Sequence, residues 1–166
     1  MLRLQATRAE DLERITGEIH DWFFDVDDVT FDAGRSEVVV PFRRWSTDEA
    51  RVVETPPRSL FRRLLAMGGR SEWEVPWYRW MLRVKDATSC ELGDNAEIGS
   101  ADFNGVEYDA DAGLVTVKGN IPVTISVRVR RLDVRVEETG QVIGLARYTT
   151  WPSGAESYTG NVLPLH

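Results

Sequence analysis

The sequence predicts a β-rich α+β fold, in which an antiparallel sheet system carries one N-terminal helix and one short inserted helix. Apolar residues alternate with a period of two over most of the chain after residue 29, which is typical of half-buried strands. A spacing of three and four is confined to the N-terminal stretch, and turn residues separate the alternating runs. This pattern favours a sandwich or a half-open barrel.

The N-terminal helix is predicted over residues 8–20, where apolar side chains recur in steps of three and four: Leu12, Ile15, Ile19 and Trp22. Thr7 and Glu10 have the spacing of a capping box at its start. The inserted helix is predicted from Ser59 to about residue 65, before Gly68-Gly69.

Alternation and turn residues define the strands in chain order. The predicted strands are 29–31 and 38–42, joined as a hairpin, then 77–84 continuing to 92, 101–108, 114–118, 121–137 and 142–148. Pro41 lacks a backbone donor, so its strand is expected at a sheet edge or near a bulge. A step of three between Val129 and Leu132 predicts a bulge, and residues 138–141 predict a turn.

With 166 residues, the chain is predicted to form a single domain, 1–166, that contains a weak internal duplication. Residues 20–92 and 97–138 are the two predicted copies, and an insertion at about 44–75 interrupts the first. Positions match at an offset of 77 in the hairpins (Asp25 with Asp102, Val38 with Val115) and of 45 in the following strands (Trp80 with Ile125). The alternative is a chance similarity between alternating strands.

Composition narrows the function classes. The formal net charge of −7 disfavours binding to nucleic acid or to anionic lipid, and it favours a basic protein as partner. No signal peptide or apolar stretch of membrane-spanning length is found, and the single Cys90 fits a reducing compartment, so we expect a cytoplasmic protein. An edge strand at Pro41 makes a homodimer plausible.

The densest polar cluster contains His20, Asp21, Asp25, Asp27 and Asp28. Imidazole and carboxylate groups together bind divalent metals or act as general bases, so these residues are the candidate catalytic and metal-binding residues. The alternative is structural, because a histidine at a helix end and acids before a strand are common. No second internal histidine is available for a multi-histidine site.

A second candidate is an aromatic binding site at Trp73 and Trp77, with Arg79 beside Trp77 on the same strand face. Core packing is the alternative for these rings. No phosphate-binding loop, calcium loop or nucleophile motif is present, so no cofactor is predicted. Cys90 is predicted to be a small buried hydrophobe.

Three functions are compatible with these features of the sequence. The first is a non-enzymatic binding protein whose acidic surface recognises a basic partner, as an inhibitor or an immunity-type protein does. The second is a small metal-assisted hydrolase centred on His20, Asp21 and Asp25, and the third is a carbohydrate or small-ligand binder that uses Trp73 and Trp77.

Overall fold

A computed structural model of the chain describes residues 3–46, 49–53, 71–94, 97, 99–120 and 122–150, together with the backbone of 156–163. The described chain divides into two compact units. Unit 1 is Met1–Arg44 with Arg79–Gly140, and unit 2 is Trp45–Tyr78 with Gln141–His166. The single domain and the internal duplication stay predictions.

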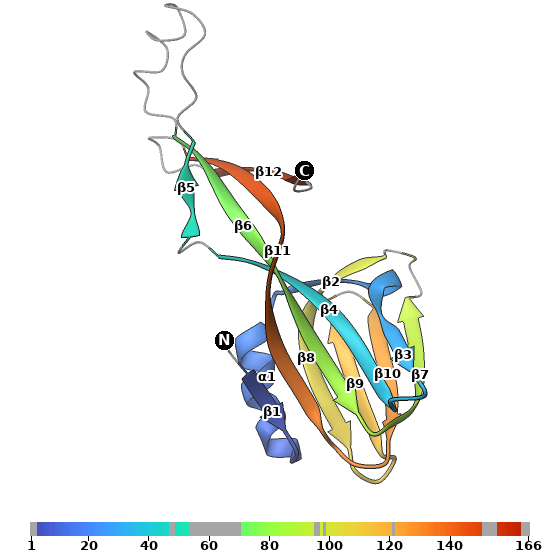
Figure 1. Ribbon diagram of the computed structural model, residues 1–166. Helices are drawn as coiled ribbons and strands as arrows, with labels where there is room; N and C mark the ends of the chain where they lie inside the picture. The colour runs from blue at the N-terminus through green and yellow to red at the C-terminus, as the bar shows by residue number, and fades with distance from the viewer. Residues whose placement is uncertain are drawn as a thin grey trace, which may run out of the picture. The chain divides into compact units, whose positions relative to one another are not determined.

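Unit 1 is an antiparallel sheet with one α-helix at its N-terminal end (Figure 1). Its elements are β1 (Arg3–Ala6), η1 (Ala9–Asp11), α1 (Leu12–Ile19), β2 (Phe23–Asp25), η2 (Val26–Asp28), β3 (Thr30–Asp32), β4 (Glu37–Trp45), β7 (Ala87–Asp94), β8 (Ser100–Asp109), β9 (Leu114–Gly119) and β10 (Val123–Val129). The strands β6 (Ser71–Lys85) and β11 (Val134–Thr150) contribute to both units.

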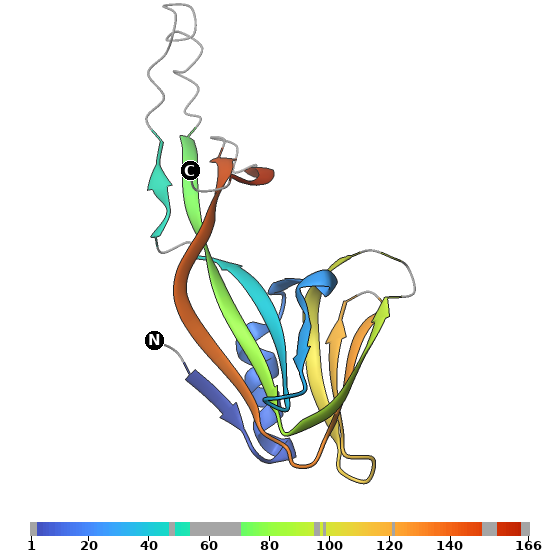
Figure 2. The same ribbon diagram turned by 45° about the vertical axis from the view of Figure 1, so that its right-hand side comes forward.

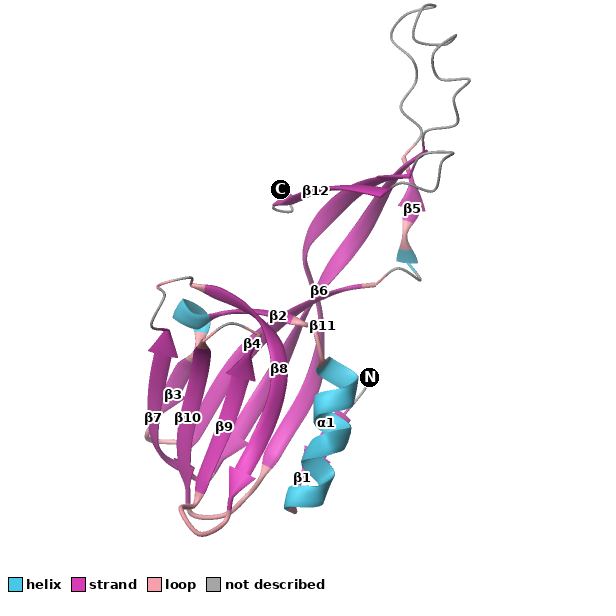
Figure 3. Ribbon diagram, turned by 180° about the vertical axis from the view of Figure 1, so that it is seen from behind, coloured by secondary structure: helices cyan, strands magenta, loops and turns pink. Residues whose placement is uncertain are grey.

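The strand order in unit 1 is β1-β11-β6-β4-β2-β8-β9-β10-β7, and β3 pairs with β4 beside β2. The sheet is not closed, and α1 lies beside β1 and β8 in the view of Figure 3. The prediction of a β-rich α+β fold with an antiparallel sheet is therefore confirmed. The predicted inserted helix at 59–65 lies outside the described residues.

The core of unit 1 follows directly from the alternation in the sequence. In β10, the side chains of Val123, Ile125 and Val127 are buried, whereas those between them are not. Each such buried aliphatic side chain contributes about 1.5 to 3 kcal/mol through removal of apolar surface from water. At the centre of the sheet, Phe42 contacts Phe24 and Phe103 edge to face, with ring centroids 5.4 and 5.6 Å apart.

The N-terminal helix is confirmed, but its start differs from the prediction. The chain enters α1 through the 3-10 turn η1, whose N-cap is Arg8, and no side chain caps either helix. The predicted capping box at Thr7 and Glu10 is therefore wrong. Leu12, Ile15 and Ile19 form the buried face of α1, as their spacing predicts.

Of the two positions expected for Pro41, the sheet edge is wrong, because β4 lies between β6 and β2, whereas a local irregularity is present where η2 interrupts the neighbouring strand. Three predictions about strand boundaries are wrong. The strand predicted over 77–84 does not continue to 92, because β6 ends at Lys85 and β7 begins at Ala87 and pairs with β10. Residues 130–133 are a bend that connects β10 to a new strand, rather than a bulge within one strand. Residues 138–141 form no turn, because β11 runs without a break through Gly140, whose φ is 69°.

Unit 2 adds β5 (Arg51–Val52), which pairs with β6, and β12 (Glu156–Leu163), which pairs with β11. The aromatic rings of this unit pack against one another. Trp73 stacks on Tyr148 with the centroids 6.1 Å apart, and Trp45 lies 5.3 Å from Trp77. The buried side of β6 also changes, because Val75 and Trp77 are buried in unit 2, whereas Trp80 and Leu82 are buried in unit 1.

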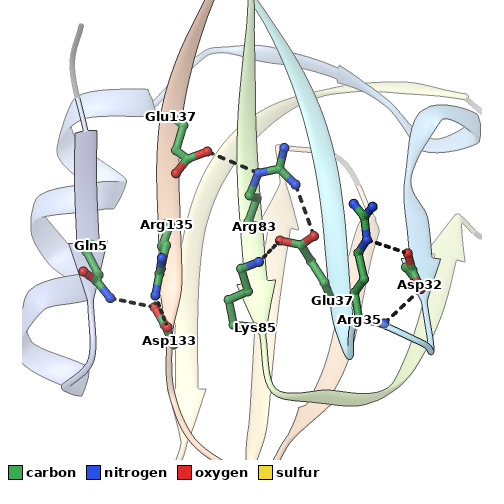
Figure 4. A network of polar contacts seen from close by, with 9 residues as sticks. All are labelled: Gln5, Asp32, Arg35, Glu37, Arg83, Lys85, Asp133, Arg135 and Glu137. Carbon is green, nitrogen blue, oxygen red and sulfur yellow. Dashed lines mark hydrogen bonds and ion pairs between the residues drawn. The ribbon is translucent and has the colours of Figure 1, made fainter.

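A charged network crosses the sheet of unit 1 from β11 to β4 (Figure 4). The buried carboxylate of Glu37 lies 3.2 Å from Nη1 of Arg83 and 2.6 Å from Nζ of Lys85. Arg83 also reaches Glu137 on β11, with 3.3 Å between Nε and the carboxylate. The network thereby ties together β4, β6 and β11.

A second buried carboxylate, Asp133, lies at the start of β11. It accepts hydrogen bonds from Nε and Nη2 of Arg135, at 3.0 and 2.7 Å, and from the amide of Gln5 on β1, at 2.9 Å. The hydrogen bonds from Arg135 lower the pKa of Asp133, against the opposing effect of burial. Asp133 thus fastens β1 to β11 in its ionised form.

We expect the substitution Asp133→Asn to make the free energy of unfolding less dependent on pH below neutrality. Because the folded-state pKa of Asp133 is lowered, its contribution is present above the unfolded pKa and is lost as pH falls through the folded value. Urea unfolding between pH 7 and pH 3 should therefore show a smaller loss of stability in the variant than in the wild type. An unchanged slope would show that this carboxylate is not linked to folding.

Candidate acidic binding surface

The candidate site is built around β2, which crosses the middle of the sheet in unit 1. The chain reverses after α1 at Asp21, a non-glycine residue with φ of 64°. Backbone hydrogen bonds then hold β2 against β8: Phe103 N–H donates to Trp22 at 2.8 Å, and Val26 N–H donates to Gly99 at 2.8 Å. The acidic sequence at residues 21–28 is thereby fixed beside β8.

Alternation along β2 separates its apolar and polar side chains. Phe24 points into the core and is fully buried, so Phe23 and Asp25 occupy the opposite face. In the antiparallel register, Phe23 lies opposite Asp102, and Asp25 lies opposite Ser100. Asp25 and Asp102 therefore share the outer face of the β2–β8 pair.

Seven carboxylates lie on β2 and β8 or on the segments that flank these strands, and we call them the β2 surface. Asp94 belongs to the same region, because its Oδ2 accepts a hydrogen bond from the N–H of Gly99 at 2.9 Å. The members of the β2 surface are Asp21, Asp25, Asp27, Asp28, Asp94, Glu97 and Asp102. Four of them are exposed to solvent: Asp21, Asp27, Asp28 and Glu97.

Among the described residues, Arg43 is the one arginine or lysine that forms an ion pair with the members of the β2 surface other than Asp94. Its Nη2 lies 2.8 Å from Oδ1 of Asp25, and both side chains are partly buried. Asp102 has a neutral partner instead, since it accepts a hydrogen bond from Nδ2 of Asn120 at 2.6 Å. The β2 surface therefore keeps a large excess of negative charge.

The residues of the predicted metal site do not converge on one point. His20 Nδ1 lies 2.9 Å from Asp21, and His20 Nε2 lies 3.3 Å from Oδ1 of Asn104, so both ring nitrogens have polar partners. Asp25 instead pairs with Arg43. In the part of the chain that is described, no three His, Cys, Asp or Glu side chains are grouped to hold a metal ion. The catalytic and metal-binding roles stay predictions that no contact supports.

The residues of the predicted aromatic site fall in different units. Trp77 is buried in unit 2, and Trp73 is half-buried there, with its indole N–H donating to Thr150 at 3.1 Å. Arg79 belongs to unit 1, where its carbonyl accepts a hydrogen bond from Thr139 at 2.6 Å. The more exposed ring in unit 2 is Trp45, at 41%, which the sequence analysis missed.

Cys90 is half-buried on β7, and burial together with the nearby Glu91 raises the pKa of its thiol. A raised pKa keeps the thiol protonated at neutral pH, so it is a poor nucleophile. The weak nucleophilicity fits the prediction of a small buried hydrophobe, but the side chain is only half-buried.

The remaining members of the β2 surface were not predicted as site residues. Asp94, Glu97 and Asp102 lie about 70 or more positions from β2 in the sequence, so no local motif joins them to it. One signal was present, because the offset of 77 already aligned Asp102 with Asp25. Arg43 and Asn120 are related by the same offset, and each binds the corresponding aspartate.

Comparison with known proteins adds no functional information, since no family model, no curated protein and no solved structure matches this chain. None of the helices in the described residues has the length and apolar character of a membrane span.

Proposed function

We propose that this protein is a non-enzymatic binding protein that recognises a basic protein partner, as an inhibitor or an immunity-type protein does. The observation that carries the proposal is the β2 surface, in which seven carboxylates lie on or beside one strand pair; apart from Asp94, Arg43 alone among the described arginines and lysines forms an ion pair with them. The negative electrostatic potential of such a surface raises the association rate of a cationic partner and lowers that of an anionic one.

The distribution of charge between the two units supports the same conclusion. The sequence of unit 2 contains six acidic and six basic residues, so the formal charge of −7 lies entirely in unit 1. Unit 1 is also the unit that carries the β2 surface. The excess acid is therefore concentrated where the proposed binding surface lies, rather than spread over the whole chain.

The two alternative functions, a metal-assisted hydrolase and a carbohydrate or small-ligand binder, have weaker support. The metal-assisted hydrolase needs His20, Asp21 and Asp25 to act together, but their contacts divide them. The carbohydrate-binding alternative needs open rings at Trp73 and Trp77, and these rings are half-buried and buried. In the proposed role the protein acts in the cytoplasm, needs no cofactor and does not bind nucleic acid; homodimerisation is compatible with it.

The proposal predicts that removing charge from the β2 surface weakens binding to a polycation. Poly-L-lysine of about 20 residues is the probe, and calorimetry is the measurement. The substitutions Asp27→Asn and Asp28→Asn together should raise Kd about five- to tenfold at low salt, and the difference should shrink as salt screens the charges. Poly-L-glutamate should not bind.

The matched control is the pair Glu13→Gln and Asp111→Asn, which removes the same charge from two exposed positions outside the β2 surface, one on α1 and one in the β8–β9 turn. It should change Kd by less than about twofold, because exposed charges more than a Debye length apart are largely screened. Equal weakening by both pairs would mean that only the net charge matters. Equal weakening, or an absence of binding to poly-L-lysine, contradicts the proposal.

A further inference from the structure

The strand order of unit 1 is symmetric about the β2–β8 pair, except that β1 has no counterpart at the other end. From the centre outwards, β2, β4 and β6 lie on one side, and β8, β9 and β10 lie on the other. The next strands are exchanged between the sides: β7, which follows β6 in the chain, pairs with β10, whereas β11, which follows β10, lies beside β6. Two chain segments with the same path are thus related by an approximate twofold rotation.

Contacts in the two hairpins repeat at the offset of 77. In the β3–β4 turn, Oδ1 of Asp32 accepts a hydrogen bond from the N–H of Arg35 at 3.0 Å. In the β8–β9 turn, Oδ1 of Asp109 accepts one from the N–H of Ala112, also at 3.0 Å. Both residues of the second pair lie 77 positions after those of the first, so the turns have the same geometry at equivalent positions.

The pairing of β2 with β8 is symmetric in the same sense. A shift of 77 converts Trp22 to Gly99 and Val26 to Phe103. The two hydrogen bonds that join these strands run from Val26 to Gly99 and from Phe103 to Trp22, both at 2.8 Å, so each is the equivalent of the other. The approximate twofold axis therefore passes beside the paired residues Phe24 and Ala101.

The symmetry is broken at the outer edges of the sheet. On one side, β1 pairs antiparallel with β11, and α1 then packs on β8, where the Thr16 hydroxyl accepts a hydrogen bond from Val106 at 3.2 Å. On the other side, the equivalent strand β7 pairs only with β10 among the described strands. The start of β7 is held by a hydrogen bond from Ala87 to Ser36 at 2.9 Å, and beyond it the edge of β7 has no strand beside it in the described chain.

Apolar side chains are exposed at this uncovered side. Leu92 of β7 lies opposite the buried Ile125, so it points to the inner face of the sheet, yet it is 47% exposed. Phe31 of β3 lies opposite the buried Val38 and is 39% exposed. Figure 1 places β3 and β7 at the side of unit 1 away from β1 and α1, and Figure 2 shows β7 again on the side opposite β1. Their inner-facing side chains therefore lack the cover that β1 and α1 provide on the other side.

We propose that β7 and β3 form the docking site for a segment of the basic partner, which adds antiparallel to β7 as a strand and continues as an amphipathic helix over Phe31. This inference rests on the proposed function and names the form of the partner. The occupant is inferred from the equivalent position, where β1 and α1 of this chain have that form. Main-chain hydrogen bonds to a sheet edge supply affinity, and apolar pockets supply specificity. The exposed Glu91, Asp27 and Asp28 favour basic residues on the segment's outer side.

The test uses the full-length chain and a synthetic peptide with the sequence of residues 3–19, in which the acids are replaced by their amides. The replaced residues are Glu10, Asp11, Glu13 and Glu18, which leaves Arg3, Arg8 and Arg14 as its charged side chains. We expect binding at a ratio of one to one by calorimetry. Leu92→Ser and Phe31→Ser together should raise Kd tenfold or more, because the bound state loses two buried apolar side chains.

The matched control is Val52→Ser, which removes an apolar side chain of unit 2 that is 54% exposed; it should leave Kd unchanged. Hydrogen exchange should slow at Ser89–Gly93 when the peptide binds. No binding, slower exchange along β11 instead of β7, or self-association of the chain through β7 would each overturn the proposal. The Leu92 and Phe31 substitutions leave the charge unchanged, so binding of poly-L-lysine that depends on Asp27 and Asp28 would still support the proposed function.

Discussion

Replacement of Phe42 by alanine should lower the free energy of unfolding by about 4 kcal/mol, within the range for large-to-small changes of a buried phenylalanine. Phe42 is fully buried, and its ring contacts Phe24 from the paired strand β2 and Phe103 from β8. The three rings come from strands on both sides of the approximate twofold axis. Loss of the central ring leaves a cavity that the closely paired backbones cannot fill by moving.

Urea unfolding, followed by tryptophan fluorescence and by circular dichroism, measures this change. The matched control is Phe31→Ala, since Phe31 is 39% exposed and should cost less than about 1 kcal/mol. If both substitutions had the same small effect, the aromatic cluster would not be the centre of the core. If Phe42→Ala does not fold, the milder substitution Phe42→Leu provides the test, and we expect it to lower the free energy of unfolding by about 1 to 2 kcal/mol.

The second large effect is expected for Glu37→Gln, which should destabilise the protein by about 3 kcal/mol, near the lower end of the range for breaking a buried ion pair. The Glu37 carboxylate is buried between Arg83 and Lys85, and the variant leaves both cations without this partner. Arg83 keeps its ion pair with Glu137, and the two cations are about one-third exposed, so part of the penalty is relieved by water.

The control for Glu37 is Glu107→Gln, which breaks an exposed ion pair with Lys118 on the neighbouring strand β9. That substitution should change stability by less than about 1 kcal/mol. Glu37→Gln should also leave the affinity for poly-L-lysine within about twofold, because Glu37 is buried and lies outside the β2 surface. A loss of binding without a loss of stability would contradict this separation of folding and recognition.

Stability and recognition thus draw on different carboxylates of the same unit. Glu37 and Asp133 are buried and contact arginine, lysine or glutamine side chains. Asp27, Asp28 and Glu97 are exposed, and no ion pair joins them to another described side chain. The number of acidic residues in the sequence is therefore larger than the number of carboxylates that a partner can contact. Whether an acid is buried or exposed decides its role.

The sequence predicted the strands and the helix because their patterns are local. Alternation in 114–118 identified β9, and the three-four spacing in 8–20 identified α1. Turn chemistry around Asp32 and Asp109 likewise located both hairpins. The errors fell at positions where a distant strand decides the outcome. Pro41 was expected at a sheet edge or near a bulge; its strand lies inside the sheet, and the interruption of the neighbouring strand by η2 accommodates the missing donor.

The candidate site was only half predicted for the same reason. The acids of residues 21–28 form a visible cluster in the sequence, but their separation into a His20 contact, an Arg43 ion pair and exposed charges depends on strand pairing. The association of Trp77 with Arg79 stays a prediction, and what the structure adds is that Trp77 is buried and that the buried side of β6 changes between Trp77 and Trp80. Periodicity alone does not show such a change, since each half of the strand alternates correctly.

The amino-acid sequence by itself determined the strand content, the helix, the acidic charge and the offset of 77 between the hairpins, because each depends on neighbouring residues or on a direct comparison of positions. The tertiary structure alone decided that β7 and β11 exchange sides and that β1 covers one edge of the sheet, while no described strand covers the other. It also decided which carboxylates are buried. Strand pairing joins residues that are up to about 130 positions apart, and the hydrogen bonds that form it are made by backbone groups common to almost every residue.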